Sequence, residues 1–273
     1  MGALLRRLRK TAGLSGQELA ARLEVSQSHL SRVELGDATA TVELVGRWLA
    51  ESGASEADRA AALELAEAVA VVVGTWKDAR SSGLAKIQRD AAEAEAAATA
   101  SLAFVPSLVP GLMQTPDYAT ALVAGDHPDR VDIAEAVAAR MQRQVVLYSP
   151  GKTLRWVIGE AGLRWRMGSP SVMAAQLDRI AELAGQPHLD VRVLPFARTR
   201  EVWHDHGFTI DVGRIDGEPD LVHVELLTGP VNITDPSQVA QYVSAFDTLA
   251  ALCLAGAEAA AFIRRIREQE YRP

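Results

Sequence analysis

The sequence predicts a mainly α-helical fold with a smaller α+β part, and three observations indicate it. Short amphipathic helices with capping residues follow one another over the first seventy residues. Alanine-rich helical segments continue beyond them. In the second half, short segments of alternating apolar and polar residues are typical of strands, and three of them lie close together. We therefore expect five helices in an N-terminal domain over residues 1–75, and a helical C-terminal domain with a small antiparallel sheet over 76–273.

The N-terminal helices have recognisable ends. Leu5 and Leu8 begin an apolar stripe at helical spacing, and a fifth helix rich in alanine and glutamate is expected over 55–73. Ser15 and Glu18 have the spacing of a capping box, in which each side chain bonds the backbone amide of the other. The other predicted ends are Gly13 for the first helix, Ser26 and Gly36 for the third, and Thr41 for the start of the fourth.

The rest of the chain alternates helices and strands. Helices are expected over 76–103 with an interruption near 81–83, from Pro116 to Gly125, and over 130–147, 171–185, 236–254 and 257–270. Strands are expected over 153–160, 189–196, 207–212 and 221–227.

Composition and charge narrow the class of protein. No window has the eighteen or so apolar residues that a membrane span needs, and the first residues do not have the pattern of a signal peptide. The single cysteine, Cys253, can form no internal disulfide, so we expect a cytoplasmic protein. The net charge is −7, yet residues 1–52 carry seven Lys or Arg against six acids and leave −8 for the rest. This asymmetry indicates two parts with different functions.

Residues 15–36 have the pattern of two helices joined by a tight turn. Ala20 is small enough for the second helix to cross the first at that point, and five apolar residues fill the wedge: Leu19, Leu23, Val25, Leu30 and Val33. The outward face of the second helix then presents Gln27, Ser28, Ser31 and Arg32. Gln pairs well with adenine and Arg with guanine, while the amides at Ser15, Gln17 and Ser26 suit phosphates. The alternative is a helical bundle whose polar face is only solvated.

The segment "LRRLRKTAGLSGQELAARLEVSQSHLSRVELG" resembles the phage-repressor-like (XRE) helix-turn-helix domain of transcriptional regulators. The resemblance implies five helices and places Gln27, Ser28 and Arg32 where base contacts are usual. Three features depart from the family. Gly16 replaces a phosphate-binding Gln, Glu24 replaces the turn glycine, and "ELGDATA", with Asp37, lacks a basic residue. We therefore expect fewer phosphate contacts and weaker binding by a single domain.

Six segments of the C-terminal part carry a second resemblance. They are "VPGLMQTPDYA" (109–119), "RMQRQ" (140–144), "IGEAGLRWRMGSPSVMAAQLDRI" (158–180), "VRVLPF" (191–196), "GFTI" (207–210) and "HVELLTG" (223–229). They resemble the C-terminal domain of unknown function (DUF5753) of antitoxin-like regulators from sporulating filamentous bacteria. The resemblance implies a regulator that is paired with a small partner protein encoded nearby.

Two short motifs raise the question of catalysis or metal binding. His204 and His206 share one face of a predicted extended segment, as do His223 and Glu225, so the four form a candidate transition-metal site. The alternative is that they are half-exposed strand residues. Glu160 is expected to pair with Arg164 or Arg166 rather than to act as a catalytic acid. The sequence has none of the common phosphate-loop, zincin or nucleophile-elbow motifs. We therefore expect no catalytic residue and no cofactor.

The leading hypothesis is a sequence-specific regulator that binds double-stranded DNA as a homodimer on a near-palindromic operator. Its C-terminal domain would respond to a small partner protein or a small-molecule effector. An alternative is an antitoxin-like module that sequesters a small neighbouring protein and binds DNA only for autoregulation. A third hypothesis is a metal- or ligand-dependent enzyme fused to a DNA-binding domain. The residues expected to contact DNA are Ser15, Gln17, Ser26, Gln27, Ser28, Ser31 and Arg32.

Overall fold

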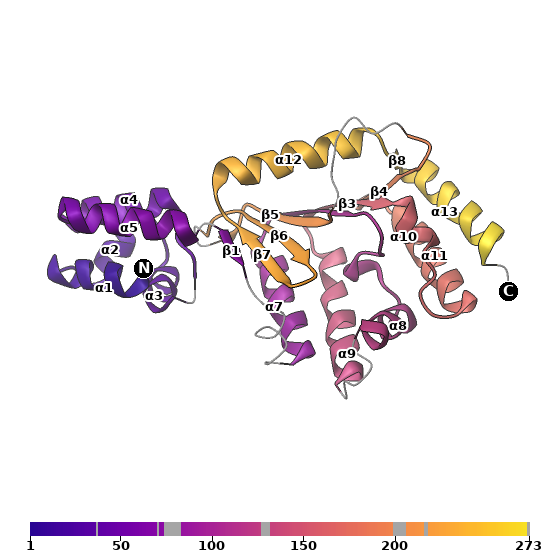
Figure 1. Ribbon diagram of the computed structural model, residues 1–273, viewed down its shortest axis with the longest axis horizontal. Helices are drawn as coiled ribbons and strands as arrows, with labels where there is room; N and C mark the ends of the chain where they lie inside the picture. Colours follow the sequence, from indigo (N-terminus) through magenta and orange to yellow (C-terminus); the bar gives the residue numbers. More distant parts are fainter. Residues whose placement is uncertain are drawn as a thin grey trace.

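Five helices form the N-terminal part of the computed structural model, which describes residues 1–36, 38–69, 71–73, 83–126, 132–198, 206–215 and 218–271. These helices are α1 (Gly2–Thr11), α2 (Gly16–Leu23), α3 (Gln27–Leu35), α4 (Val42–Glu51) and α5 (Glu56–Val69). They enclose a core of their own that includes the fully buried Leu5, Leu19, Leu30 and Trp48. The expected apolar stripes therefore face inward, and Figure 1 shows the five helices as a separate cluster at the N-terminal end.

The described part of the C-terminal region contains an eight-stranded mixed sheet. Its strands are β1 (Val71–Val73), β2 (Ala100–Val105), β3 (Thr153–Gly159), β4 (Asp190–Leu194), β5 (Phe208–Val212), β6 (Leu221–Leu226), β7 (Gly229–Ile233) and β8 (Leu254–Ala255). The strand order is β1-β7-β6-β5-β2-β3-β4-β8. β2, β3 and β4 run parallel to one another, and the other neighbours are antiparallel.

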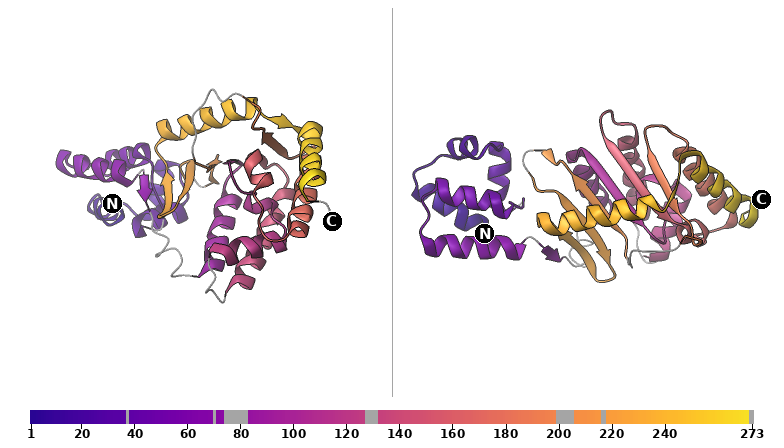
Figure 2. Two further views of the ribbon diagram at one scale, coloured as in Figure 1. Left: turned by 45° about the vertical axis from the view of Figure 1, so that its right-hand side comes forward. Right: turned by 90° about the horizontal axis from the view of Figure 1, so that it is seen from above.

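Helices cover the two faces of the sheet unequally. They are α7 (Leu84–Ala97), α8 (Pro116–Asp126), α9 (Ile133–Arg143), α10 (Glu160–Arg164), α11 (Pro170–Ala184), α12 (Pro236–Ala251) and α13 (Gly256–Glu270), with 3-10 turns at Gly111–Met113 and Gln144–Tyr148. α12 lies alone across one face of the sheet (Figures 1 and 2). α7 to α11 lie on the other side (Figure 1).

Two hydrophobic cores follow from this layering. Beneath α12, Phe104 and Ile210 of the sheet belong to the same core as Phe246 of the helix. On the opposite face, Trp156 and Ile158 belong to a larger core with α11 and α13. Successive residues of a strand point to opposite faces, so one strand such as β3 supplies both cores.

The predicted fold class is confirmed, because helices dominate and the C-terminal region adds a sheet. The sheet is larger than predicted and is mixed rather than wholly antiparallel. β5 and β6 pair as expected, but β2 and β3 lie between β4 and β5. The parallel strands β2 to β4 are brought together by connections through helices, and such long-range pairing leaves no local signal in the sequence.

Three expected helices extended too far. Residues 71–73 form β1 rather than the end of the fifth helix, and 100–103 form β2 rather than the end of the alanine-rich helix. Leu254–Ala255 forms β8 instead of continuing α12. In β2 and β8, pairing with a neighbouring strand overrides the helix propensity of alanine and leucine, whereas the three valines of β1 favour a strand by themselves.

The predicted domain boundary near residue 75 stays a prediction, and it falls outside the described residues. Residues 71–73 already belong to the sheet, through β7. Within the described residues, no helix combines the length and the apolar character that crossing a membrane requires.

Candidate nucleic-acid interface

The start of α2 is fixed by the predicted capping box. The Glu18 amide donates to Ser15 Oγ at 3.1 Å, and the Ser15 amide donates to Glu18 Oε2 at 2.8 Å. These hydrogen bonds lower the pKa of the Glu18 carboxyl, so it stays ionised. Ser15 and Gln17 are both exposed at this helix end. The capping box uses the amides of Ser15 and Glu18, so the amides of Gly16 and Gln17 are the ones at this helix end that suit a phosphate.

The second helix of the motif is capped at both ends as predicted. The His29 amide donates to Ser26 Oγ at 3.0 Å at the start of α3. Gly36 adopts a left-handed conformation with φ 87° at its end. α3 is therefore a defined helix of nine residues, from Gln27 to Leu35.

The two helices pack through the residues that the sequence predicts. Leu19, Ala20 and Leu23 of α2, with Leu30 and Val33 of α3, are each no more than 3% exposed. Val25 is partly buried against the same core. Burying this wedge fixes which face of α3 points outward.

The outward face of α3 carries the predicted base-reading side chains. Gln27 and Ser28 are exposed, while Ser31 and Arg32 are half-buried. The Arg32 side chain keeps 43% of its surface exposed. The structure thus brings Gln27, Ser28, Ser31 and Arg32 together on one helix surface, next to the Ser26 cap. Their contact with DNA stays a prediction.

Glu24 occupies the turn between α2 and α3. Among the described non-glycine residues it alone has a positive φ, with φ 58° and ψ 38°. A glycine adopts this left-handed conformation at much lower energy, because it has no Cβ. The turn therefore has the geometry that the family's glycine would give, and Glu24 is strained in it. The guanidinium of Arg47 donates to the Leu23 carbonyl at 2.6 Å and supports the same turn.

A buried ion pair, which the sequence analysis did not predict, joins α1 to α3. Arg9 Nε and Nη2 donate to the two carboxylate oxygens of Glu34 at 2.5 and 2.9 Å. Arg9 Nη1 also donates to the Leu14 carbonyl at 2.7 Å. Both side chains of the ion pair are nearly buried, with 11% and 7% exposed. The one sequence signal for this pair is Arg9 itself, a charged residue directly after Leu8 on an otherwise apolar face of the helix.

The C-terminal region reaches the outward face of α3. Arg32 Nη2 lies 2.7 Å from Glu218 Oε1, in the loop that joins β5 to β6. His29 Nδ1 lies 3.9 Å from the same oxygen, and the His29 side chain is completely buried. Neither Glu218 nor His29 is predicted from the sequence, since contacts between residues so distant in the chain leave no local pattern. Arg32, which the sequence predicts to contact bases, is therefore already paired within the chain.

The candidate metal residues do not converge in the described part of the chain. His206 Nε2 lies 3.2 Å from the Tyr242 hydroxyl, on the side of the sheet that α12 covers. His223 Nδ1 lies 2.7 Å from Asn232 Oδ1, and its neighbours Val222 and Val224 face the α12 core. His206 and His223 therefore lie on opposite faces of the sheet.

The remaining metal candidates do not complete a site. His223 and Glu225 form an ion pair at 3.9 Å. No group of three metal-ligating side chains occurs among the described residues. His204 lies outside them, so the four-residue hypothesis is tested only in part.

The Glu160 carboxylate is held by structural contacts, as the sequence predicts. Arg164 Nε donates to Glu160 Oε1 at 2.6 Å, and the Phe196 amide donates to Oε2 at 2.7 Å. Of the two predicted arginines, Arg164 is the one that pairs with Glu160, and it also pairs with Glu270. Both carboxylate oxygens are thus engaged in fixing the end of β3 against the 194–196 segment.

The side chains of α9 make contacts within the domain. Arg140 Nε and Arg143 Nη1 both donate to Gln88 Oε1 of α7, at 3.2 and 2.6 Å. Arg143 also pairs with Glu95. Of two tryptophans in this domain, Trp156 is 4% exposed and belongs to the core, whereas Trp165 is 64% exposed.

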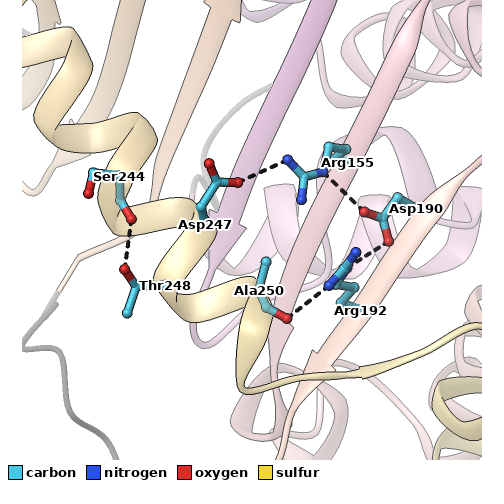
Figure 3. A network of polar contacts seen from close by, with 7 residues as sticks. All are labelled: Arg155, Asp190, Arg192, Ser244, Asp247, Thr248 and Ala250. Carbon is cyan, nitrogen blue, oxygen red and sulfur yellow. Dashed lines mark hydrogen bonds and ion pairs between the residues drawn. The ribbon is translucent and has the colours of Figure 1, made fainter.

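An ion-pair network ties α12 to the parallel strands (Figure 3). Arg155 of β3 pairs with Asp190 at 3.1 Å and with Asp247 of α12 at 3.0 Å. Arg192 pairs with Asp190 at 2.8 Å and donates to the Ala250 carbonyl at 3.0 Å. Burial opposes ionisation of Asp190, but hydrogen bonds from Arg192 and Arg155 outweigh it and lower the pKa of this carboxyl. The network therefore anchors the C-terminal half of α12.

Comparisons with known proteins match two separate segments of the chain. A model of the helix-turn-helix domain matches residues 1–62. A model described as "Domain of unknown function (DUF5753)" matches residues 88–265, which is more than half of the chain. The chain belongs to the DUF5753 family.

Two further comparisons give no functional assignment. The search of curated proteins found no match to this DUF5753 protein. The solved structure of TrmBL2, titled as an archaeal chromatin protein that shows a novel mode of DNA binding, is 16% identical. The match covers 89% of this chain and 88% of that one, but its TM-score of 0.32 is too low to support an inference.

The contact between α3 and the β5–β6 loop joins the two segments that the family models match. Arg32 lies in the segment that matches the helix-turn-helix model, and Glu218 in the segment that matches DUF5753. The predicted helix-turn-helix domain at the N-terminus and the predicted DUF5753 domain are thus confirmed, and the two matched segments meet at the outward face of α3.

Proposed function

We propose that this protein is a sequence-specific transcriptional regulator that binds double-stranded DNA by placing α3 in the major groove. The observation that carries the proposal is the presentation of Gln27 and Ser28 on the exposed face of a helix-turn-helix whose packing is complete. A Gln side chain forms two hydrogen bonds with adenine, and Arg32, once free of Glu218, is able to do the same with guanine. Serine hydroxyls add donors and acceptors for either base or backbone.

Phosphate contacts in this proposal come mainly from backbone amides. The proposed donors lie at the N-terminus of α2, where the capping box leaves the amides of Gly16 and Gln17 unused, and at the Ser26 cap of α3. Gly16 contributes no side chain, and few basic residues surround the motif. We therefore propose that one domain binds weakly and that two copies act together, with their α3 helices about 34–36 Å apart on a near-palindromic operator. Dimerisation would involve residues 76–270.

The C-terminal domain is proposed to regulate binding in response to a small partner protein or a small-molecule effector. We propose no enzymatic activity. The engagement of both Glu160 oxygens by Arg164 and Phe196 supports a structural role for that carboxylate. The proposal includes a cytoplasmic location, because a regulator of this kind acts where the DNA is.

Selection from a pool of random-sequence duplexes by the full-length protein tests the proposal. The selected duplex is then titrated with wild-type protein and with Gln27→Ala. Loss of the adenine contact is expected to weaken specific binding roughly tenfold or more, and to leave binding to an unselected duplex unchanged. Gln238→Ala, an exposed Gln on α12, is the matched control. Failure of the full-length protein to enrich any sequence would refute the proposal.

The dimer is tested on the same duplex. Sedimentation of the complex should show two chains per duplex, and a footprint should show two half-sites one helical turn apart or a multiple of it. A single chain on a single half-site would contradict the dimer while leaving sequence-specific binding intact.

A further inference from the structure

The loop between β5 and β6 places a carboxylate against the outward face of α3. Glu218 Oε1 lies 2.7 Å from Arg32 Nη2, and only 11% of the Glu218 side chain is exposed. Arg32 is one of the side chains that the proposed function assigns to base reading. A carboxylate at this distance engages the guanidinium in the way that a phosphate or a guanine edge otherwise would.

Glu218 is held in this orientation by its own loop. Arg214 Nη2 lies 2.6 Å from Glu218 Oε2, and Arg214 Nη1 donates to the Pro219 carbonyl at 3.3 Å. The Glu218 amide donates to the Ile215 carbonyl at 3.3 Å, and the Gly213 amide donates to Asp220 Oδ1 at 2.8 Å. One carboxylate oxygen is thus fixed by Arg214, and the other is directed at Arg32.

The contact also covers part of α3. His29 is completely buried and lies 3.9 Å from the oxygen that meets Arg32. Nearby, Thr41 at the start of α4 lines one hollow together with Pro219 and Asp220 of the loop and residues of α12. The β5–β6 loop therefore stands beside the helix-turn-helix at several points. Arg32 cannot reach a base in the major groove while the Glu218 carboxylate holds its guanidinium.

We propose that the Arg32–Glu218 contact is an autoinhibitory latch, in which the C-terminal domain holds Arg32 of the recognition helix and must release it before DNA binds. This inference rests on the proposed function. The free protein is then an equilibrium between a latched form and an open form, and the apparent affinity for DNA is reduced by the fraction that is latched. A partner or effector that binds the open form better would raise DNA affinity by the same coupling.

Replacement of Glu218 by Gln tests the latch in the full-length protein. Glu218→Gln keeps the size of the side chain and removes its charge. We expect it to bind the selected duplex roughly 3- to 10-fold more tightly than wild type, because the open form becomes more populated. Glu258→Gln removes one equivalent charge from the exposed first turn of α13 and should change affinity less than about twofold. Equal or weaker binding by Glu218→Gln would overturn the latch.

Hydrogen exchange tests the latch in the wild-type protein, without any substitution. The described amides of the β5–β6 loop, at 213–215, 218 and 220, should exchange faster once the selected duplex is bound. Unchanged or slower exchange would mean that the loop stays in place, and the latch would be wrong. If wild type and Glu218→Gln bind the selected duplex equally, the latch alone fails. If neither binds any duplex selectively, the proposed function fails and the latch with it.

Discussion

The guanidinium of Arg9 and the carboxylate of Glu34 form a two-pronged hydrogen-bonded ion pair inside the N-terminal domain, with N–O distances of 2.5 and 2.9 Å. This pair joins α1 to the helix that carries the candidate DNA contacts. The Glu34 hydrogen bond also raises the pKa of Arg9, so its charge is maintained at all ordinary pH values. The orientation of α3 therefore depends on a polar contact as well as on the apolar wedge.

Arg9→Met should destabilise the N-terminal domain by about 3 kcal/mol, because it leaves a nearly buried carboxylate without its main partner. The longer contact of Glu34 with the half-exposed Arg6, at 3.7 Å, compensates only in part. Urea unfolding, followed by hydrogen exchange of amides in α1 to α4, measures the loss. Arg22→Met removes an exposed pair with Glu51 and should cost less than about 1 kcal/mol. Equal effects of the two substitutions would contradict the structural role of the buried pair.

Glu24→Gly should stabilise the helix-turn-helix by about 1 kcal/mol. Glycine adopts φ 58° without the clash that a Cβ makes there. The Glu24 side chain contributes little, since it is 85% exposed and lies 3.9 Å from Arg47. Glu24→Ala separates the two effects because it removes the side chain and keeps the Cβ, so its stability should match wild type. Comparison of the urea midpoints of the three proteins decides the matter, and a stabilised Ala variant would show that the strain argument is incorrect.

Local signals in the sequence were sufficient to predict most of the N-terminal domain. The capping box at Ser15 and Glu18, the Ser26 cap and the glycine end at Gly36 are short-range patterns, and each is present in the structure. They act within one helical turn, so the identity of a few neighbours determines them. The candidate site was predictable for the same reason, because the wedge and the outward face both follow from helical periodicity.

The remaining features depend on contacts between distant segments. β2 is rich in alanine, yet it lies in the middle of the sheet between β3 and β5, where pairing on both sides favours a strand. β7 contains Pro230, which weakens its strand pattern. The buried Arg9–Glu34 pair and the Arg32–Glu218 contact join side chains whose proximity is set by the fold. The partners of each pair lie far apart in the chain, so no short segment of the sequence indicates that they meet.

The purified protein should bind less than one equivalent of zinc or nickel, because His206 and His223 lie on opposite faces of the sheet. Elemental analysis after equilibration with each metal and removal of the excess measures the stoichiometry. One full equivalent that is lost both in His206→Ala and in His223→Ala would contradict this placement, since it would require the two imidazoles to share an ion.

Cys253 should react slowly with iodoacetamide in the native protein. The residue is partly buried beside the α12 core, where its thiol donates to the Leu249 carbonyl at 3.1 Å, and burial raises its pKa to about 12. The thiolate fraction at pH 8 is then ~10³-fold lower than in the unfolded chain, whose cysteine ionises near its ordinary pKa. Alkylation followed by mass spectrometry, with and without denaturant, compares the two rates. Native and unfolded chains that react equally fast would contradict the burial of the thiol.

The raised pKa of the Cys253 thiol also predicts how the free energy of unfolding depends on pH. Between about pH 9 and pH 12 the unfolded chain loses the Cys253 proton while the folded protein retains it, so the folded state binds more protons and its stability falls as pH rises. Cys253→Ala lacks this proton and should lose less stability than wild type over the same range. Other alkaline groups, such as Tyr118 and Tyr271, whose pKa values burial also raises, affect both proteins alike. The difference in urea-unfolding free energy between wild type and Cys253→Ala should therefore change in favour of the variant from pH 8 to pH 10.5. A difference that is independent of pH would show that the thiol ionises equally in both states.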